Sequence, residues 1–159
     1  MNNMRFLALF LVVLLLSGCL DQDNKTSGKY FVKKVIDGDT VELADGSRVR
    51  YIGIDTPEVR KHRGDGWVYD PEPYAENAKK YNEMLILGQR VKLEFDKEER
   101  DKYGRLLAYV FTKDSKMVNK ELLEQGYAKV LVIPPNVKYA DVFKKTQERA
   151  KEARRGIWR

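Results

Sequence analysis

The sequence predicts an α+β protein built on a small five-stranded β-barrel that carries three helices. Short segments rich in β-branched and aromatic residues, separated by Gly and Asp turn signals, predict the strands. Longer segments with apolar residues at helical spacing predict one helix inserted between strands and two helices after the last strand. About 130 residues remain once an N-terminal apolar segment is set aside, which suits one compact domain.

The predicted strands are short and are separated by recognisable turns. They cover residues 29–36, 40–44, 47–54, 90–95 and 106–112. Asp37-Gly38-Asp39 predicts a tight turn after the first strand. Asp45-Gly46 is a signal for a two-residue turn, so the second and third strands are expected to form a hairpin.

The predicted helices have apolar residues three and four positions apart. They cover residues 74–87, 117–125 and 140–155. Gly126 follows the second helix at the position where a left-handed residue commonly ends a helix, and Gly156 ends the third helix. A five-stranded OB-type barrel is one architecture that fits this order of strands and helices.

The N-terminus predicts a processed lipoprotein signal. Arg5 precedes an apolar run over residues 6–16, which is too short to span a bilayer as a helix and suits a signal peptide. The tetrapeptide LSGC, which ends at Cys19, resembles a lipobox, where the chain is cut before the Cys and the Cys carries the lipid. A plain secretory signal followed by a chance Cys is the alternative.

These features divide the chain into three parts. Residues 1–18 are the predicted signal peptide, residues 19–28 are the lipidated Cys19 and a flexible polar tether, and residues 29–159 are the folded domain. The lipid on Cys19 would attach the protein to a cell membrane, facing outside the cytoplasm, without a transmembrane helix. We expect the domain to be a monomer.

Composition narrows the function only slightly. The formal net charge is +6, which permits an anionic partner without identifying one. A single Cys excludes an internal disulfide, and a single Cys with a single His argues against a zinc site.

Acidic residues stand at the ends of the second and third strands. Asp39 opens the second strand, Asp55 closes the third, and Glu58 follows it. If these strands form a hairpin, the carboxylates fall at the same open end of the sheet, where two carboxylates and a carbonyl suit Ca²⁺ or Mg²⁺. Ordinary solvated turn residues are the alternative interpretation.

An arginine near these acids would let the same site hold an anion. Arg50 lies five residues before Asp55, so on an ideal strand the two side chains face opposite sides of the sheet. Both reach one site only if the strand bends or bulges, and Gly53 is the natural place for this.

The charged segment DKEERDKYGR, residues 96–105, joins the fourth and fifth strands. Such a run is usually a solvated loop. Here it ends in Tyr103-Gly104-Arg105, where the Gly permits a sharp turn and the guanidinium could make paired hydrogen bonds to a phosphate.

Four segments together resemble the staphylococcal nuclease (thermonuclease) family: VIDGDTVEL, VRYIGIDTPE, LEFDKEERDKYGRLLAYVF and MVNKELLEQGYAKV. The likeness covers residues 30–158, in the same order and with similar spacings. It implies an OB-fold enzyme that hydrolyses phosphodiester bonds of DNA and RNA with Ca²⁺ and releases 3′-phosphorylated products.

The resemblance also implies roles at a metal site. Asp39 and Asp55 match the metal carboxylates of the family, and Thr56 matches a ligand that binds through its backbone carbonyl. Glu58 matches the acid beside the attacking water and is a candidate catalytic residue, either as a base or as a group that orients the water.

Four further residues match the family's phosphate-binding groups. Arg50 and Arg105 match its two arginines and are candidate catalytic residues. Lys102 and Tyr103 match neighbours of the bound phosphate. A phosphodiester is an anion, so these cations and the metal would neutralise it, most strongly in the transition state.

The sequence departs from the family in two places. Where the reference nuclease carries two tyrosines that flank the bound nucleotide, this chain has apolar residues, with Val132 and Pro134 at about those positions. The segment 59–73, which we predict to be a loop, also differs in length and content. Its His62 suits a hydrated loop, and its Trp67 either stacks on a base or anchors the loop.

Two other functions remain open. An OB domain that holds single strands without cutting them is one, although such a module would need aromatic residues more than paired acids. A structural lipoprotein with a surface Ca²⁺ site is the other, and it would leave Arg50 and Arg105 without a role.

Overall fold

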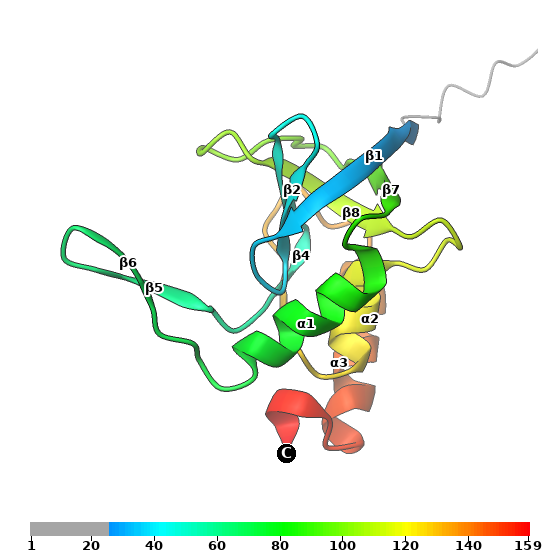
Figure 1. Cartoon of the computed structure of the whole chain (residues 1–159). Helices are drawn as coiled ribbons and strands as arrows, with labels where there is room; N and C mark the ends of the chain where they lie inside the picture. The colour runs from blue at the N-terminus through cyan, green and yellow to red at the C-terminus, as the bar shows by residue number, and fades with distance from the viewer. Residues whose placement is uncertain (1–25) are drawn as a thin grey trace, which may run out of the picture.

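The computed structural model describes residues 26–159, which form a closed barrel with three helices packed against it (Figure 1). The barrel strands are β1 (Thr26–Val35), β2 (Thr40–Leu43), β3 (Arg48–Tyr51), β7 (Arg90–Glu94) and β8 (Leu106–Phe111). They close in the order β1-β2-β3-β8-β7, with β3 and β8 parallel and the other neighbours antiparallel. The predicted α+β class, a five-stranded OB-type barrel with three helices, is confirmed.

Alternating apolar residues fill the barrel. On β2 and β3, Val41, Val49 and Tyr51 are buried, whereas the charged residues between them reach the surface or the cleft. Val91 and Leu93 on β7 are buried as well, as the alternation of that segment predicts. The strand interiors therefore supply the core, and charged side chains gather where the strands end.

Three helices cover the barrel: α1 (Ala75–Ile86), α2 (Val118–Glu124) and α3 (Ala140–Glu152). Gly126 follows α2 with a φ of 71°, which is the predicted left-handed end of that helix. α3 ends at Glu152, before the predicted residue 155, because Arg154 adopts a left-handed conformation with a φ of 49°. A short 3₁₀ helix, η1 (Gly156–Trp158), completes the chain.

The third predicted strand is divided in two. β3 ends at Tyr51, and the chain leaves the barrel at Gly53, whose φ is 81°. β4 (Gly53–Asp55) then pairs with β9 (Lys129–Leu131), a strand that the sequence did not reveal. The bend predicted at Gly53 is confirmed.

A buried asparagine fixes this break between β3 and β4. Asn119 on α2 donates a hydrogen bond from Nδ2 to the carbonyl of Ile52 at 2.9 Å. Its Oδ1 accepts from the backbone amide of Val110 on β8, also at 2.9 Å. Asn119 therefore satisfies the backbone groups that lose a strand partner where β3 stops.

Replacing Gly53 with alanine is expected to destabilise the fold by about 3 kcal/mol, because a left-handed conformation and a crowded site both oppose a side chain there. An added Cβ would lie 2.6 Å from Cε2 of Phe143. Gly46→Ala is the matched control, since its φ is 85° but an added Cβ meets nothing within 4 Å. Urea unfolding should show a clearly smaller loss for the control, and equal losses would contradict the role given to Phe143.

The segment predicted as a loop over residues 59–73 contains a two-stranded hairpin. β5 (Arg60–Arg63) pairs with β6 (Gly66–Tyr69), and the pair projects away from the barrel (Figure 1). β5 has the sequence RKHR, which lacks the apolar alternation that usually identifies a strand. The prediction of a loop was therefore wrong for these residues.

The start of β1 and the β2–β3 connection also differ from the predictions, and the predicted signal peptide lies outside the described residues. β1 begins at Thr26 and pairs with β7 from there, so the segment predicted as a tether reaches into the barrel. The β2–β3 connection is longer than two residues, and Gly46 takes its positive φ. The predicted signal peptide, residues 1–18, and Cys19 lie outside the described residues. Among the helices of residues 26–159, none is long and apolar enough to cross a membrane.

Candidate active site

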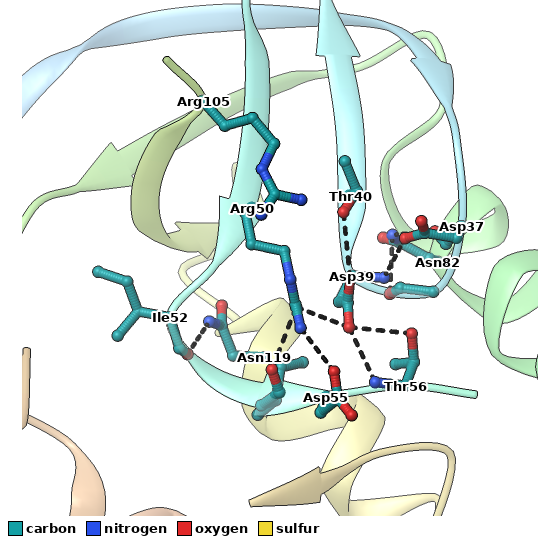
Figure 2. Close-up of polar contacts among 12 residues, drawn as sticks. Asp37, Asp39, Thr40, Arg50, Ile52, Asp55, Thr56, Asn82, Arg105 and Asn119 are labelled. Carbon is teal, nitrogen blue, oxygen red and sulfur yellow. Dashed lines mark hydrogen bonds and ion pairs between the residues drawn. The ribbon is translucent and has the colours of Figure 1, made fainter. Parts of the chain in front are cut away.

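The turn between β1 and β2 lies against the segment that follows β4 (Figure 2). The approach is close, because a Cβ on Gly38 would lie 2.6 Å from Oγ1 of Thr56. Asn82 on α1 donates to the Gly38 carbonyl at 3.1 Å and accepts from the Tyr51 hydroxyl at 3.0 Å. The barrel and α1 together therefore fix the turn that carries Asp39.

Asp39 is the buried carboxylate of the site, with 4% of its surface exposed. Its Oδ2 accepts hydrogen bonds from the Thr56 amide at 2.8 Å and the Thr56 hydroxyl at 3.0 Å. Its Oδ1 accepts from the Thr40 hydroxyl at 3.1 Å. Burial raises the pKa of Asp39 to about 7, against the lowering effect of the Arg50 guanidinium. A carboxylate in this setting is stabilised by any cation that binds beside it.

Arg50 places its guanidinium between two carboxylates (Figure 2). Nη1 lies 2.6 Å from Oδ2 of Asp39, and Nη2 lies 2.7 Å from Oδ1 of Asp55. Nη1 also donates to the carbonyl of Ile54 at 3.1 Å. The bend at Gly53 turns Asp55 to the side of Arg50, which an unbroken strand would not do.

Glu58 follows these residues at the same cavity and is held by its backbone. The Glu72 amide donates to the Glu58 carbonyl at 2.9 Å, and the Glu58 amide donates to Oε2 of Glu72 at 3.1 Å. Within the described residues, no hydrogen-bond or ion-pair partner contacts the Glu58 carboxylate. Burial, and then the charge of Asp39, raises the pKa of Glu58. This carboxylate is therefore free to accept a proton.

A tight turn before β8 positions Arg105. Asp101, which the sequence did not point to, accepts from the amides of Tyr103 at 2.9 Å and Arg105 at 3.0 Å through Oδ1. Its Oδ2 accepts from Nε of Arg105 at 2.6 Å. Gly104 supplies the positive φ of 79°, and Lys102 and Tyr103 are exposed on the turn. Because Asp101 engages Nε, the terminal nitrogens of Arg105 remain for a ligand.

One cavity of about 560 Å³ joins the acidic and basic residues. Arg50 and Arg105 line it together with Asp39 and Glu58. Asp37 also lines it, and burial raises the pKa of Asp37 as well. The remaining polar and aromatic lining residues are Lys34, Thr40, Glu42, Arg48, Arg60, Trp67, Tyr69 and Lys79. The structure therefore brings together the predicted catalytic residues, and it adds the β5–β6 hairpin to the same cavity.

A neighbouring cavity of about 490 Å³ is lined by part of the apolar segment 131–134. Arg105 lines both cavities, so the second lies directly beside the first. Leu131 and Ile133 line it, whereas Val132 and Pro134 do not. The segment 131–134 therefore offers this cavity apolar side chains and no aromatic ring.

The oxygen atoms at this end of the barrel fit a hard divalent cation. The carboxylates of Asp39 and Asp55 and the backbone carbonyl of Thr56 are the ligand type that Ca²⁺ prefers. The Arg50 guanidinium already bridges the two carboxylates, so the pair attracts positive charge. In the described part of the chain, no group of three or more His, Cys, Asp or Glu side chains could hold a metal. A carbonyl and water would therefore complete the coordination.

The metal-free protein is expected to lose stability as pH rises. The pKa of Asp39 increases from 3.8 to about 7 on folding, so the folded state binds more protons between these values. The free energy of unfolding should therefore fall through this window, by the order of 2–4 kcal/mol. Urea unfolding in chelator at several pH values measures this fall, and Asp39→Asn should make it smaller, with Asp37 and Glu58 supplying the remainder. A wild-type profile that rises with pH would contradict the prediction.

A family model described as staphylococcal nuclease homologue matches residues 48–159. The matched range contains Arg50, Asp55, Glu58 and Arg105 and begins after Asp39. It also contains both strands of the β5–β6 hairpin. The match therefore covers most of the chain and most of the cavity.

Named relatives agree with this match. The SPbeta prophage-derived endonuclease YokF of Bacillus subtilis (strain 168) is 44% identical over 79% of this chain and 42% of its own length. The thermonuclease of Staphylococcus intermedius is 42% identical over 81% of this chain and 75% of its own length. Endonuclease YncB of Bacillus subtilis (strain 168) is 42% identical over 79% of this chain and 59% of its own length. The chain belongs to the staphylococcal nuclease family.

Proposed function

We propose that this protein is a calcium-dependent nuclease that hydrolyses phosphodiester bonds of DNA and RNA and leaves 3′-phosphates. The observation that carries the proposal is the single cavity that Asp39, Glu58, Arg50 and Arg105 line. A module that only binds nucleic acid has no use for a buried carboxylate with a raised pKa. The names of the relatives, endonuclease and thermonuclease, support the same reaction.

Asp39, Asp55 and Thr56 would hold the calcium ion. Calcium bound there supplies positive charge that offsets the charge of a phosphodiester and of its transition state. Hydrogen bonds from Thr56 and Thr40 keep Asp39 in place without a metal. The site is therefore organised before the ion arrives.

Glu58 would accept the proton of the attacking water. Its carboxylate has no protein partner in the described residues, and its raised pKa brings it closer to neutral pH, where a general base works well. The water oxygen forms a bond to phosphorus, and the bond from phosphorus to the 5′ oxygen breaks. The products are a 3′-phosphate and a 5′-hydroxyl.

Arg50 and Arg105 would bind the non-bridging phosphate oxygens. The terminal nitrogens of Arg105 can make two parallel hydrogen bonds to a phosphate, which a lysine cannot do. The extra negative charge of the transition state strengthens these contacts, so they lower the barrier. Lys102 and Tyr103, exposed on the same turn, would contact the phosphate that follows.

Cleavage of a labelled single-stranded oligonucleotide in calcium tests this proposal. Mass spectrometry of the products should find 3′-phosphate and 5′-hydroxyl ends. Binding without cleavage would favour the alternative, a non-catalytic OB-fold lipoprotein that binds nucleic acid. Products with 5′-phosphates would contradict the assignment of the bond that breaks.

We also propose that a lipid on Cys19 holds the protein at a membrane, outside the cytoplasm. The support is the LSGC sequence after the apolar run 6–16. Intact mass should show that residues 1–18 are removed and that acyl mass is added. Cys19→Ala should leave the membrane fraction. A soluble wild-type protein cut at another residue would contradict this proposal.

A further inference from the structure

The β5–β6 hairpin borders the cavity, yet the chemistry proposed above gives it no role. Arg60, Trp67 and Tyr69 line the 560 Å³ cavity with the carboxylates. Trp67 also lines an adjoining pocket together with Arg48 and Arg105. The hairpin is therefore a wall of the cleft in which a substrate phosphate would bind.

One face of the hairpin carries the side chains that line the cleft. Arg60 pairs with Tyr69 in the antiparallel ladder, and His62 pairs with Trp67. Directly paired residues, and residues two apart, share a face, so these four side chains lie together. The opposite face carries Lys61, Arg63 and Val68.

Trp67 does not anchor the hairpin to the barrel. Its side chain is 67% exposed, whereas a Trp that anchored a loop would be buried against the protein body. Its ring contact within the described residues is His62 of the same hairpin, edge to face, with the centroids 5.5 Å apart. The indole is therefore oriented by its own hairpin, and it lines the cleft while remaining largely exposed.

The basic residues on the outer face of the hairpin are paired with acidic residues, whereas several of those lining the cavity are unpaired among the described residues. On the outer face, Lys61 pairs with Glu72 at 3.4 Å, and Arg63 pairs with Asp70. The cavity contains cations that make no ion pair within the described residues: Lys34, Arg48, Arg60 and Lys79. Unpaired cations beside an exposed aromatic ring match a polyanion that carries stacking bases.

The base of the hairpin is fixed to the catalytic segment. Glu72, which follows β6, makes the two hydrogen bonds to the Glu58 backbone described above, one through its amide and one through its carboxylate. The Tyr69 hydroxyl donates to Oε1 of Glu76 on α1 at 2.8 Å. A strand held by the hairpin is therefore held at a defined position relative to Glu58.

We propose that the hairpin face, defined by Arg60, Trp67 and Tyr69, binds single-stranded nucleic acid beside the scissile phosphate. Trp67 stacks on one base, and Arg60 contacts a neighbouring phosphate. This contact supplies the aromatic surface that Leu131 and Ile133 do not offer. The proposal rests on the proposed nuclease function, because it places a polynucleotide in the cleft.

The fluorescence of Trp67 tests the contact directly. The chain has two tryptophans, so full-length protein with Trp158→Phe reports on Trp67 alone. Cys19→Ala removes the lipid, and Glu58→Gln slows cleavage while calcium is present. We expect a thymidine oligonucleotide to quench the fluorescence and anionic phospholipid vesicles to leave it unchanged. No response to the oligonucleotide, or a response to vesicles alone, would overturn the proposal.

Kinetics on a single-stranded oligonucleotide provide the second test. Trp67→Ala should raise KM about 10-fold with a smaller change in kcat, since stacking acts on the ground state and the transition state alike. Trp67→Phe should restore most of the affinity. Val68→Ala, from the outer face, is the matched control and should stay within about twofold of wild type. Equal effects of Trp67→Ala and Val68→Ala would overturn the proposal.

The salt dependence separates the two basic faces. Arg60→Ala should reduce the slope of log affinity against log salt by about 0.7, as expected for one lost contact to a single strand. Arg63→Ala on the outer face should leave the slope unchanged, and equal slopes in both variants would contradict the assignment. If the oligonucleotide quenches Trp67 but the wild-type protein cleaves no oligonucleotide, the proposed nuclease function is contradicted and the proposed binding by the hairpin face is supported. If cleavage is normal and Trp67→Ala binds like wild type, the hairpin proposal fails alone.

Discussion

Replacing Glu58 with glutamine is expected to lower the turnover of phosphodiester cleavage by about 10²–10⁴-fold, the usual contribution of a positioned general base. Glutamine keeps the shape of the side chain but cannot take a proton. The Glu58 backbone contacts to Glu72 do not involve the side chain of residue 58, so the variant should fold normally. The measurement is kcat over a calcium series.

The calcium series also separates two roles for Glu58. A base sets the plateau rate, so the calcium concentration at half-maximal rate should stay the same in Glu58→Gln. Glu72→Gln is the matched control, because its amide oxygen can still accept the bond from the Glu58 backbone. It should keep a near-normal rate. A variant in which only the calcium midpoint moves would make Glu58 a metal ligand instead.

Replacing Arg105 with lysine is expected to cost about 10²–10³-fold in kcat, the size found when one donor to a developing oxyanion is removed. Asp101 engages Nε of Arg105, so the two terminal nitrogens form the fork that faces the cavity. Lysine keeps the charge but has one nitrogen and no plane. Arg149→Lys on α3 is a remote control that should have no effect. A near-normal rate in Arg105→Lys would show that charge alone suffices.

Arg50→Lys should show a second effect besides a similar loss of rate. Arg50 contacts Asp39, Asp55 and the Ile54 carbonyl at once in this structure. A lysine cannot bridge all three, so the metal-free variant should also be less stable than wild type. Urea unfolding with and without calcium would separate this effect from the loss of catalysis.

The barrel and the bend could be predicted because their signals are local. Apolar alternation identified the strands, and the parity of Arg50 and Asp55 required a bend that Gly53 provides with its φ of 81°. β5 was missed because four consecutive polar residues show no alternation. β9 was missed because it has three residues and pairs with β4, far away in the sequence.

Part of the candidate site could be predicted from local sequence, and part depends on contacts between residues far apart in the chain. Acids at strand ends are visible in the sequence, but the contacts that orient them are not local. Asn119 bonds to a carbonyl 67 residues away, and Asn82 reaches the Gly38 carbonyl across 44 residues.

A calcium titration of DNA cleavage tests whether an ion held by Asp39 and Asp55 and a phosphate held by Arg50 and Arg105 meet in one cavity. We predict that the wild-type rate saturates with calcium and disappears in EGTA. Asp39→Ala and Asp55→Ala should shift the midpoint to higher calcium, because the lost carboxylates hold the ion. Undiminished cleavage in EGTA, or unchanged midpoints in both variants, would contradict this arrangement.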